Sequence, residues 1–322
     1  MDNSQKNIFV GITDVSQAET IISQYRRDYP EDLSGAESLL SDLLEALYEA
    51  EQLVGEPNDF HNFSVSISKI INDSKKANYI VQQGLKIHPL NTDLLADAIR
   101  YGYNCGEKER CREWYDTLNS IDQLRWSWRA FSFSIDYLLK EWISNTENNY
   151  SIEDILKLAR DYQNMLPDTE DAWFSEYEIY AGTNQREKSI TVLENAMTKF
   201  KFCPRCWLRY ADIMIDDGEY EKAEPIIRKM RKNPKTREAI NTSYMYFLDA
   251  QCKIARLYAS DEYDRGDIDK DAVWMIYKTL RMALLSSGLR ENIKTQIDDY
   301  IMELSDQSGE EFPDEWRYRV NE

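Results

Sequence analysis

Residues that break helices or form tight turns are scarce in this sequence. Of 322 residues, only 11 are Gly and 8 are Pro. This scarcity disfavours a β-sandwich or barrel, whose many short strands need frequent turns, and it favours helices joined by short connections. Only two histidines, His61 and His88, are present, which leaves little scope for imidazole catalysis or for a multi-histidine metal site. The five cysteines are odd in number and widely spread, so they do not form a disulfide framework.

Long apolar runs are also lacking. No window reaches the ~18 consecutive apolar residues that a membrane-spanning helix needs, and the first residues have neither the basic region nor the apolar core of a secretion signal. Together with the cysteine count, these absences predict a cytoplasmic protein with reduced thiols that does not enter a membrane.

Positive charge is in deficit. The chain has 39 Lys and Arg against 58 Asp and Glu, so its net charge is −19 and its pI is about 4.7. We expect it to repel nucleic acid and anionic membranes, except where a basic patch is segregated locally. The hydrophobic fraction of 42% and the aromatic fraction of 12% are too high for a disordered chain.

Apolar residues recur at helical spacing almost throughout, which predicts an all-α fold. One clear example starts at a capping-box pattern, Ser34 to Glu37, and is expected to stop before Gly55 and Pro57. Its apolar stripe consists of Leu39, Leu40, Leu43, Leu44, Leu47 and Leu53.

Some residues recur at a fixed distance of 34 positions. Trp173 and Trp207 form one such pair, and Ala77 and Cys111 form another. This period is expected of a repeat that contains two short helices joined by a turn.

These features resemble the tetratricopeptide-repeat (TPR) family. The clearest unit runs from about 204 to 237, where Trp207, Gly218, Ala223 and Pro234 occupy family positions. Weaker units cover 58–91, 92–125 and 170–203, and a longer one covers 126–169. The resemblance implies a right-handed α-α superhelix, that is, a TPR-like solenoid of helix-turn-helix repeats. We therefore expect a helical capping segment at 1–57, a repeat array at 58–290, and a closing helix with an acidic and aromatic tail at 291–322.

The resemblance implies binding rather than catalysis. Such arrays commonly hold a peptide or a partner helix in a concave groove, so we expect a cytoplasmic adaptor or scaffold that works within a larger complex. The family's carboxylate clamp is not recognisable, and the sequence does not indicate an oligomeric state. By position in the repeats, the expected groove residues are Arg100, Tyr103, Asn104, Phe174, Glu178, Arg205, Arg209 and Asp212.

A basic cluster locally reverses the sign of the charge. It consists of Arg228, Lys229, Arg231, Lys232, Lys235 and Arg237. One interpretation is a docking patch for an acidic segment, a phosphate or nucleic acid, which would be the only route to nucleic-acid binding. The other is a solvated helix end whose cations complement the helix dipole and pair with nearby acids.

No catalytic constellation is present, so we expect neither an enzyme nor a bound cofactor or metal. Cys203 and Cys206 form a single CxxC motif, which fits a thiol-redox pair, half of a zinc site, or two unlinked thiols. A peptide-regulated signalling protein is a further alternative. However, the regulators of that class that resemble this family need an N-terminal DNA-binding helix-turn-helix, and 1–57 lacks its turn signature.

Aromatic residues are dense in one band, where they either form core or stack bases. The band consists of Trp114, Tyr115, Trp126, Trp128, Phe131, Phe133, Tyr137 and Trp142. The tail from Ser305 to Glu322 carries Phe312, Trp316 and Tyr318, and it either anchors a partner or packs back on the last helix.

Overall fold

The computed structural model of the chain describes residues 9, 11–144, 150–260, 263, 268–285 and 289–312, with the backbone alone for Arg237 and Glu238. Within these ranges the regular structure is helical, and the one β-type feature is an isolated parallel bridge between Asp14 and Val54. The prediction of an all-α fold is confirmed. Among the described helices, none is long and apolar enough to cross a membrane.

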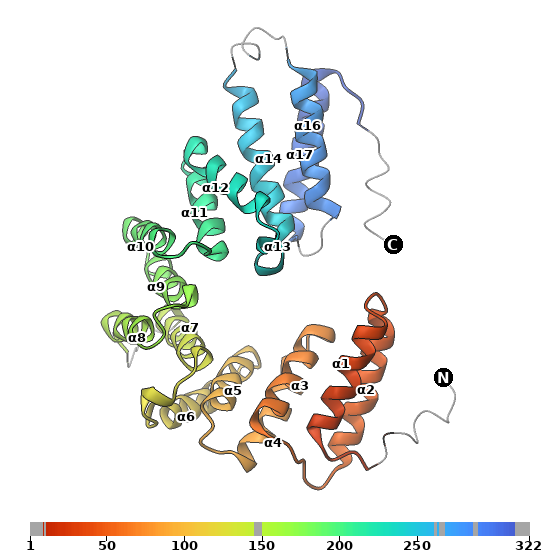
Figure 1. Ribbon diagram of the computed structural model, residues 1–322, viewed down its shortest axis with the longest axis vertical. Helices are drawn as coiled ribbons and strands as arrows, with labels where there is room; N and C mark the ends of the chain where they lie inside the picture. Colours follow the sequence, from red (N-terminus) through yellow and green to blue (C-terminus); the bar gives the residue numbers. More distant parts are fainter. Residues whose placement is uncertain are drawn as a thin grey trace. The chain divides into compact units, whose positions relative to one another are not determined.

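The chain divides into two compact units, Met1–Thr183 and Asn184–Glu322, called here the N-terminal and the C-terminal unit. Figure 1 labels their helices in chain order. The N-terminal unit contains α1 (Val15–Asp28), α2 (Leu33–Glu49), α3 (Pro57–Ile70), α4 (Ser74–Ile87), α5 (Thr92–Asn104), α6 (Lys108–Asn119), the 3-10 turn η2 (Gln123–Arg125), α7 (Trp128–Ser144), α8 (Ile152–Met165) and α9 (Glu170–Gly182). The C-terminal unit contains α10 (Arg186–Lys199), α11 (Pro204–Asp216), α12 (Tyr220–Lys232), α13 (Thr236–Ala239), α14 (Thr242–Tyr258), α16 (Lys270–Leu285) and α17 (Glu291–Ser308).

The helix boundaries follow the period seen in the sequence. The starts of α4 and α6, of α9 and α11, and of α10 and α12 are each 34 positions apart. The turns inside the pairs repeat in the same way. Asn72 (φ 50°) and Gly106 (φ 79°) are 34 positions apart, as are Asn184 (φ 57°) and Gly218 (φ 76°). Because left-handed backbone is accessible to Gly and tolerated by Asn, these four residues mark where each repeat reverses direction.

The core of the N-terminal unit begins at α1 and continues through the helix pairs. Leu40, Leu43, Leu44 and Leu47 of α2 are fully buried, which agrees with the apolar stripe expected there. The predicted ends of that helix were slightly wrong, because α2 stops at Glu49 and Leu53 is buried beyond it. Asp32, not Ser34, caps α2 by accepting a hydrogen bond from the backbone N–H of Gly35, because its carboxylate lies nearer the free amides of the first turn.

The first helices of successive pairs form a row in this unit. Helix α5 packs against α3 on one side and α7 on the other, and α7 in turn packs against α9. Phe131 of α7 stacks on Tyr162 of α8 with centroids 5.1 Å apart, and both rings are fully buried. Half of the aromatic band is therefore core, namely Tyr115, Trp126, Phe131 and Tyr137, whereas Trp128 is exposed.

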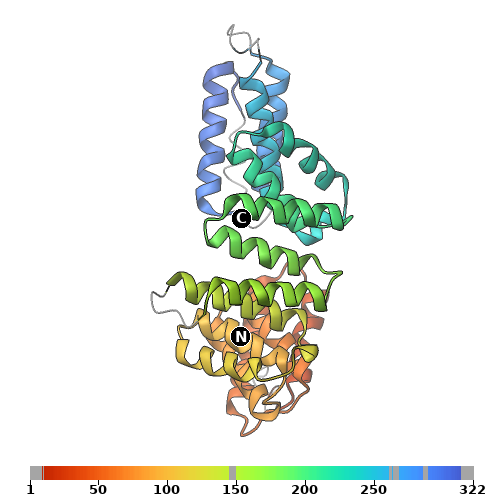
Figure 2. The same cartoon turned by 90° about the vertical axis from the view of Figure 1, so that its left-hand side faces the viewer.

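The C-terminal unit has a second core around Trp207, which is 1% exposed. Its later helices are longer than the repeat, and Figures 1 and 2 show α14, α16 and α17, in cyan to blue, running alongside one another.

The start of the tail packs back on this unit. Glu310 accepts hydrogen bonds from Lys270 (2.7 Å) and from the indole N–H of Trp274 (2.9 Å), and Phe312 stacks on Tyr277 at 4.5 Å. The tail thus packs on α16 as far as Phe312, while Trp316 and Tyr318 lie outside the described residues.

Candidate functional site

Three of the expected groove residues lie at the end of α5 in the N-terminal unit. Arg100 and Asn104 are exposed, and Tyr103 is half-buried. They follow one another at helical spacing, so they share a face of α5. Because α5 packs beside α7, this face continues onto the exposed residues of α7.

Cations on this surface are held by aromatic rings. The Arg100 guanidinium lies 4.9 Å from the centroid of the Phe133 ring, and the Lys140 ammonium lies 5.6 Å from that of Tyr103. Trp128, which is 43% exposed, packs edge-on against Phe133 at 6.2 Å. We call these residues the α5–α7 face: Arg100, Tyr103, Asn104, Trp128, Phe133 and Lys140. Cation–π contacts of this kind fix long side chains in place while leaving their charge available to a ligand.

A buried polar pair lies in the same row of helices, and sequence analysis did not single it out. His61 Nδ1 of α3 is 2.6 Å from Asp97 Oδ2 of α5, and the Asp97 side chain is fully buried. Burial raises the pKa of the Asp97 carboxyl, while the bond to His61 opposes that rise. An isolated His and an Asp far away in sequence give no signal, because only the packing of α3 on α5 brings them together.

Helix α9 carries two further expected groove residues. Glu178 is exposed, but Phe174 is only 5% exposed and packs against Tyr177 at 5.3 Å. Phe174 therefore serves the packing of the N-terminal unit, which differs from the inward-facing position that we expected from the repeat.

The remaining expected groove residues belong to α11 of the C-terminal unit. Arg205 is half-buried, and Arg209 is exposed and pairs with Asp212 at 3.1 Å. Asp212 also accepts a hydrogen bond from the Tyr244 hydroxyl at 2.5 Å, which ties α11 to α14. Burial and this carboxylate raise the pKa of Tyr244. Two of these residues thus take part in interactions within their own unit.

The basic cluster is divided among different partners. Arg228 pairs with Glu224 at 2.8 Å, Arg231 pairs with Asp249 of α14 at 2.6 Å, and Lys229 lies 4.1 Å from the centroid of Trp207. Lys232 and Lys235 are exposed, and their ammonium groups have no ion-pair partner in the described part of the chain. The side chain of Arg237 lies outside the described residues. The cluster is therefore neither a uniform basic stripe nor a fully neutralised one.

The CxxC motif is buried. Cys203 lies directly before the first residue of α11, and both it and Cys206 are fully buried and free of disulfide bonds. Reactive thiols need access to solvent and to an electropositive environment, so this position favours a structural role. Across the described ranges, no group of three or more His, Cys, Asp or Glu side chains is arranged to hold a metal.

Comparisons with known proteins identify the fold. No protein-family description matches the sequence, and no curated protein matches it. A tetratricopeptide-repeat protein from Parabacteroides merdae is similar in structure with a TM-score of 0.51 at 13% identity, over 89% of this chain and 99% of that one. A monomeric mutant of IFIT1 with m7Gppp-AAAA is similar with a TM-score of 0.54 at 13% identity, over 86% of this chain and 59% of that one.

Helix pairs that recur every 34 residues, left-handed turns at the same period and these two structures all agree. The sequence-based resemblance is thereby confirmed: the chain is a helical-repeat protein with a TPR-like fold.

Proposed function

We propose that the chain is a non-enzymatic adaptor that binds a protein or peptide segment on the α5–α7 face of its N-terminal unit. The observation that supports this most is the ordered array of aromatic rings and cations on two adjacent helices, with Trp128 and Asn104 open to solvent. A TPR-like fold is in general a scaffold for protein interactions, and this face offers it a surface.

The side chains of this face suit a peptide ligand. Trp128 and Phe133 offer apolar area, Asn104 offers both a donor and an acceptor for peptide bonds, and Arg100 and Lys140 offer charge. Arg100 rests on Phe133, and Lys140 lies over Tyr103 and pairs with Asp136, so both side chains are already held in place. Ligand binding therefore costs less side-chain entropy than it would on a surface of mobile lysines.

The non-enzymatic part of the proposal rests on the sequence, which has no recognisable catalytic motif, and on the burial of Cys203 and Cys206. Nucleic-acid binding through the basic cluster is the alternative, and the IFIT1 structure does contain a capped oligonucleotide. Against it stands the net charge of −19, which repels a nucleic-acid strand beyond the cluster itself.

Site-specific photo-crosslinking tests the adaptor proposal. A benzoylphenylalanine replaces exposed Asn104 on the α5–α7 face, and in a matched control it replaces exposed Lys86 at the end of α4. The two chains are expressed in cells and irradiated, and the crosslinked products are separated and identified by mass spectrometry.

We expect crosslinked protein at position 104 that does not form at position 86 and that decreases when Trp128 is also replaced by Ala. Equal products at both positions would contradict the proposal, as would products at 104 that are insensitive to Trp128→Ala. Crosslinks to RNA rather than to protein would favour the alternative.

A further inference from the structure

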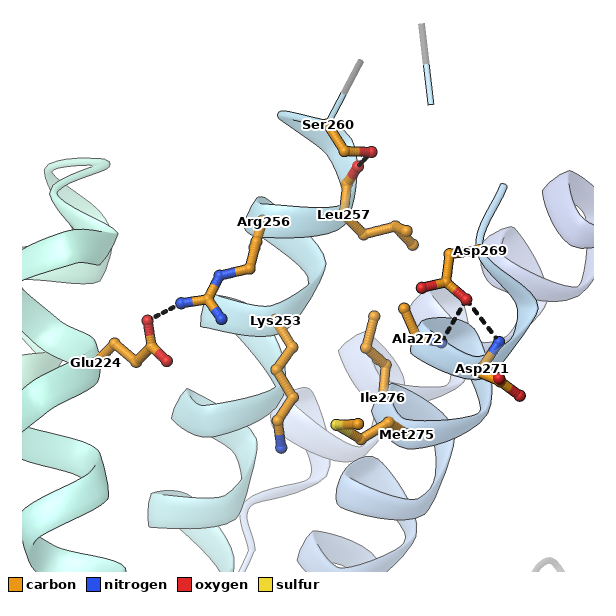
Figure 3. A pocket seen from close by; sticks show the side chains of 10 residues that line it. All are labelled: Glu224, Lys253, Arg256, Leu257, Ser260, Asp269, Asp271, Ala272, Met275 and Ile276. Atoms are coloured by element: carbon orange, nitrogen blue, oxygen red, sulfur yellow. Dashed lines mark hydrogen bonds and ion pairs between the residues drawn. The ribbon is translucent and has the colours of Figure 1, made fainter. Parts of the chain in front are cut away.

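Helices α12, α14 and α16 of the C-terminal unit enclose two adjoining cavities. One has a volume of about 680 Å³ and the other of about 480 Å³. The two cavities share the lining residues Glu224 of α12, Lys253 and Arg256 of α14, and Met275 of α16, so they lie side by side. We call the pair the α12–α14–α16 cleft; Figure 3 shows its larger part.

Cations outnumber acids at one end of this cleft. Glu224 pairs with both Arg228 and Arg256. This end therefore has two guanidinium groups for one carboxylate, and Arg228 and Arg256 remain 63% and 68% exposed.

The second acid of the cleft is shared in the same way. Asp249 is only 9% exposed and pairs with both Arg231 (2.6 Å) and Lys253 (2.7 Å). Lys232 adds a further cation that has no partner in the described part of the chain. In the smaller cavity five cations thus face two carboxylates, which gives a local charge of about +3 in a chain of −19. With Asp269 and Asp271 of the larger cavity included, the whole cleft carries about +1.

An apolar wall adjoins these cations. Leu257 of α14 and Met275 and Ile276 of α16 line the larger cavity, and Met275 is 57% exposed. In Figure 3, Leu257 and Ile276 lie between the two helices, and Met275 reaches from α16 toward Lys253. An apolar side chain of a ligand would be removed from water at this wall.

The far end of the cleft has the opposite charge. Asp269 and Asp271 lie there at the start of α16, and Asp269 caps that helix by accepting hydrogen bonds from the backbone N–H groups of Asp271 and Ala272. A polyanion such as a nucleic-acid strand, which carries charge at every unit, would be repelled at this end. A protein segment can place its acids at one end only.

We propose that the α12–α14–α16 cleft binds an acidic segment of a partner protein. The carboxylates of the bound segment accept bidentate hydrogen bonds from Arg228 and Arg256. A Leu, Ile, Met or Phe side chain of the same segment packs on Met275. The cleft lies in a different unit from the α5–α7 face, so this proposal does not depend on the function proposed for that face.

Selection from a random dodecapeptide phage-display library tests this proposal. The full chain is the target, and the recovered peptides are synthesised with a fluorescent label and titrated by anisotropy. The test variant is R228E/K232E, which reverses two exposed cations of the cleft. The matched control is K235E/K278E, which makes the same charge change at two exposed lysines that do not line it.

We expect recovered peptides rich in Asp and Glu with at least one large apolar residue. R228E/K232E should weaken their binding by about tenfold or more, since it removes charge-assisted hydrogen bonds, whereas K235E/K278E should stay within about twofold. Met275→Ala should weaken binding about threefold or more through loss of apolar contact.

Several results would overturn the proposal. These are the recovery of no acidic peptides, equal loss of binding in R228E/K232E and K235E/K278E, or tighter binding of an oligo(dT) probe than of the acidic peptides at equal salt. Circular dichroism of each variant confirms that the helices are retained, so that a loss of binding reports on the cleft.

Discussion

The two units hold their exposed cations in different ways. On the α5–α7 face, Arg100 and Lys140 rest against aromatic rings, and Lys140 also pairs with Asp136. In the α12–α14–α16 cleft, cations share carboxylates in pairs, as Arg228 and Arg256 do around Glu224. The two proposed binding surfaces therefore differ in how their cations are held.

The difference has a physical consequence for selectivity. A ring holds a cation without neutralising it, so an aromatic surface accepts varied peptide groups. In the cleft, the carboxylates of Glu224 and Asp249 compete with a ligand for the same cations. Only a ligand with carboxylates of its own can replace these pairs, so we expect the cleft to bind acidic ligands in preference to neutral ones. We expect the face to be permissive and the cleft to select acids.

The largest loss of stability is expected when one buried aromatic ring is removed from the core of a single unit. Trp207→Ala in the C-terminal unit and Phe131→Ala in the N-terminal unit each remove a fully buried ring, at a cost of about 3–5 kcal/mol. Hydrogen exchange read by mass spectrometry should show faster exchange mainly in the unit that carries the substitution. Uniform acceleration in both units, for both variants, would mean that the chain unfolds as one cooperative body.

Sequence alone predicted the fold well because it depends on local signals. The 34-residue period, the turn at Gly218 and the small residue Ala223 each act within one helix pair, and the structure has α11 and α12 where they predict. Asn72 and Asn184 take the same turn conformation as Gly106 and Gly218 but were not recognised. Asn is accepted in left-handed turns although it does not mark them as strongly as Gly does.

A second prediction compares thiols across the two units. Burial raises the pKa of Cys111 and of Cys252 to about 12, while Cys105 is half-buried and its pKa is also raised. Since only the thiolate reacts, iodoacetamide at pH 8 should label Cys105 about a hundredfold faster than Cys111 or Cys252. Raising the pH toward 9 should speed labelling at Cys105, because a raised pKa leaves its thiol mostly protonated at pH 8.

Peptide mapping of the labelled chain gives the order of reaction. Cys203 and Cys206 should also be protected, because both are fully buried. Rapid labelling of this pair in the folded chain would contradict their structural role and would support the thiol-redox alternative.

A third prediction compares two glycines under different constraints, namely space at Gly84 and left-handed backbone at Gly218. A Cβ on Gly84 of α4 would lie 2.8 Å from Phe60 Cγ, so Gly84→Ala should destabilise the N-terminal unit by about 1–3 kcal/mol through overpacking. At Gly218 a Cβ meets nothing within 4 Å, but φ is 76°, so Gly218→Ala should cost about 1 kcal/mol of strain.

Denaturant titration measures both costs, and a second pair of variants separates the two causes. Phe60→Ala removes the Cγ that a Cβ on Gly84 would meet, so the double variant F60A/G84A should cost less than the sum of its two single changes. Gly218→Asn should be milder than Gly218→Ala, since Asn already occupies this turn at position 184. A Gly218→Ala chain that is as stable as the original would show that the turn does not require left-handed backbone.

The smallest effect on stability is expected from Glu224→Gln. Its pairs with Arg228 and Arg256 are largely exposed, so their loss should cost no more than about 1 kcal/mol. The same change removes the carboxylate that competes with a ligand. Acidic peptides should therefore bind about threefold more tightly, and anisotropy at fixed salt measures this. Weaker binding would mean that Glu224 positions the arginines rather than competing for them.

The candidate sites were only partly predictable. The basic cluster was visible because its residues are close in sequence, and Glu224 lies among them on α12. The other acids of the cleft and its apolar wall come from α14 and α16 and from the residue that precedes α16. Lys253, Asp249 and Met275 give no signal of their own, because their roles depend on how α14 packs against α12 and how α16 packs against α14. Phe174 shows the opposite limit: a repeat position alone does not tell whether a side chain is exposed.

The central claim is that the two units carry separate binding surfaces. It is tested most directly by titrating one library-selected acidic peptide against R228E/K232E and against R100E/K140E, which make the same charge change in the C-terminal and N-terminal units. We predict that R228E/K232E weakens binding about tenfold or more, whereas R100E/K140E leaves it within about twofold. Equal weakening by both variants would contradict the claim, because net charge rather than a defined cleft would then govern binding.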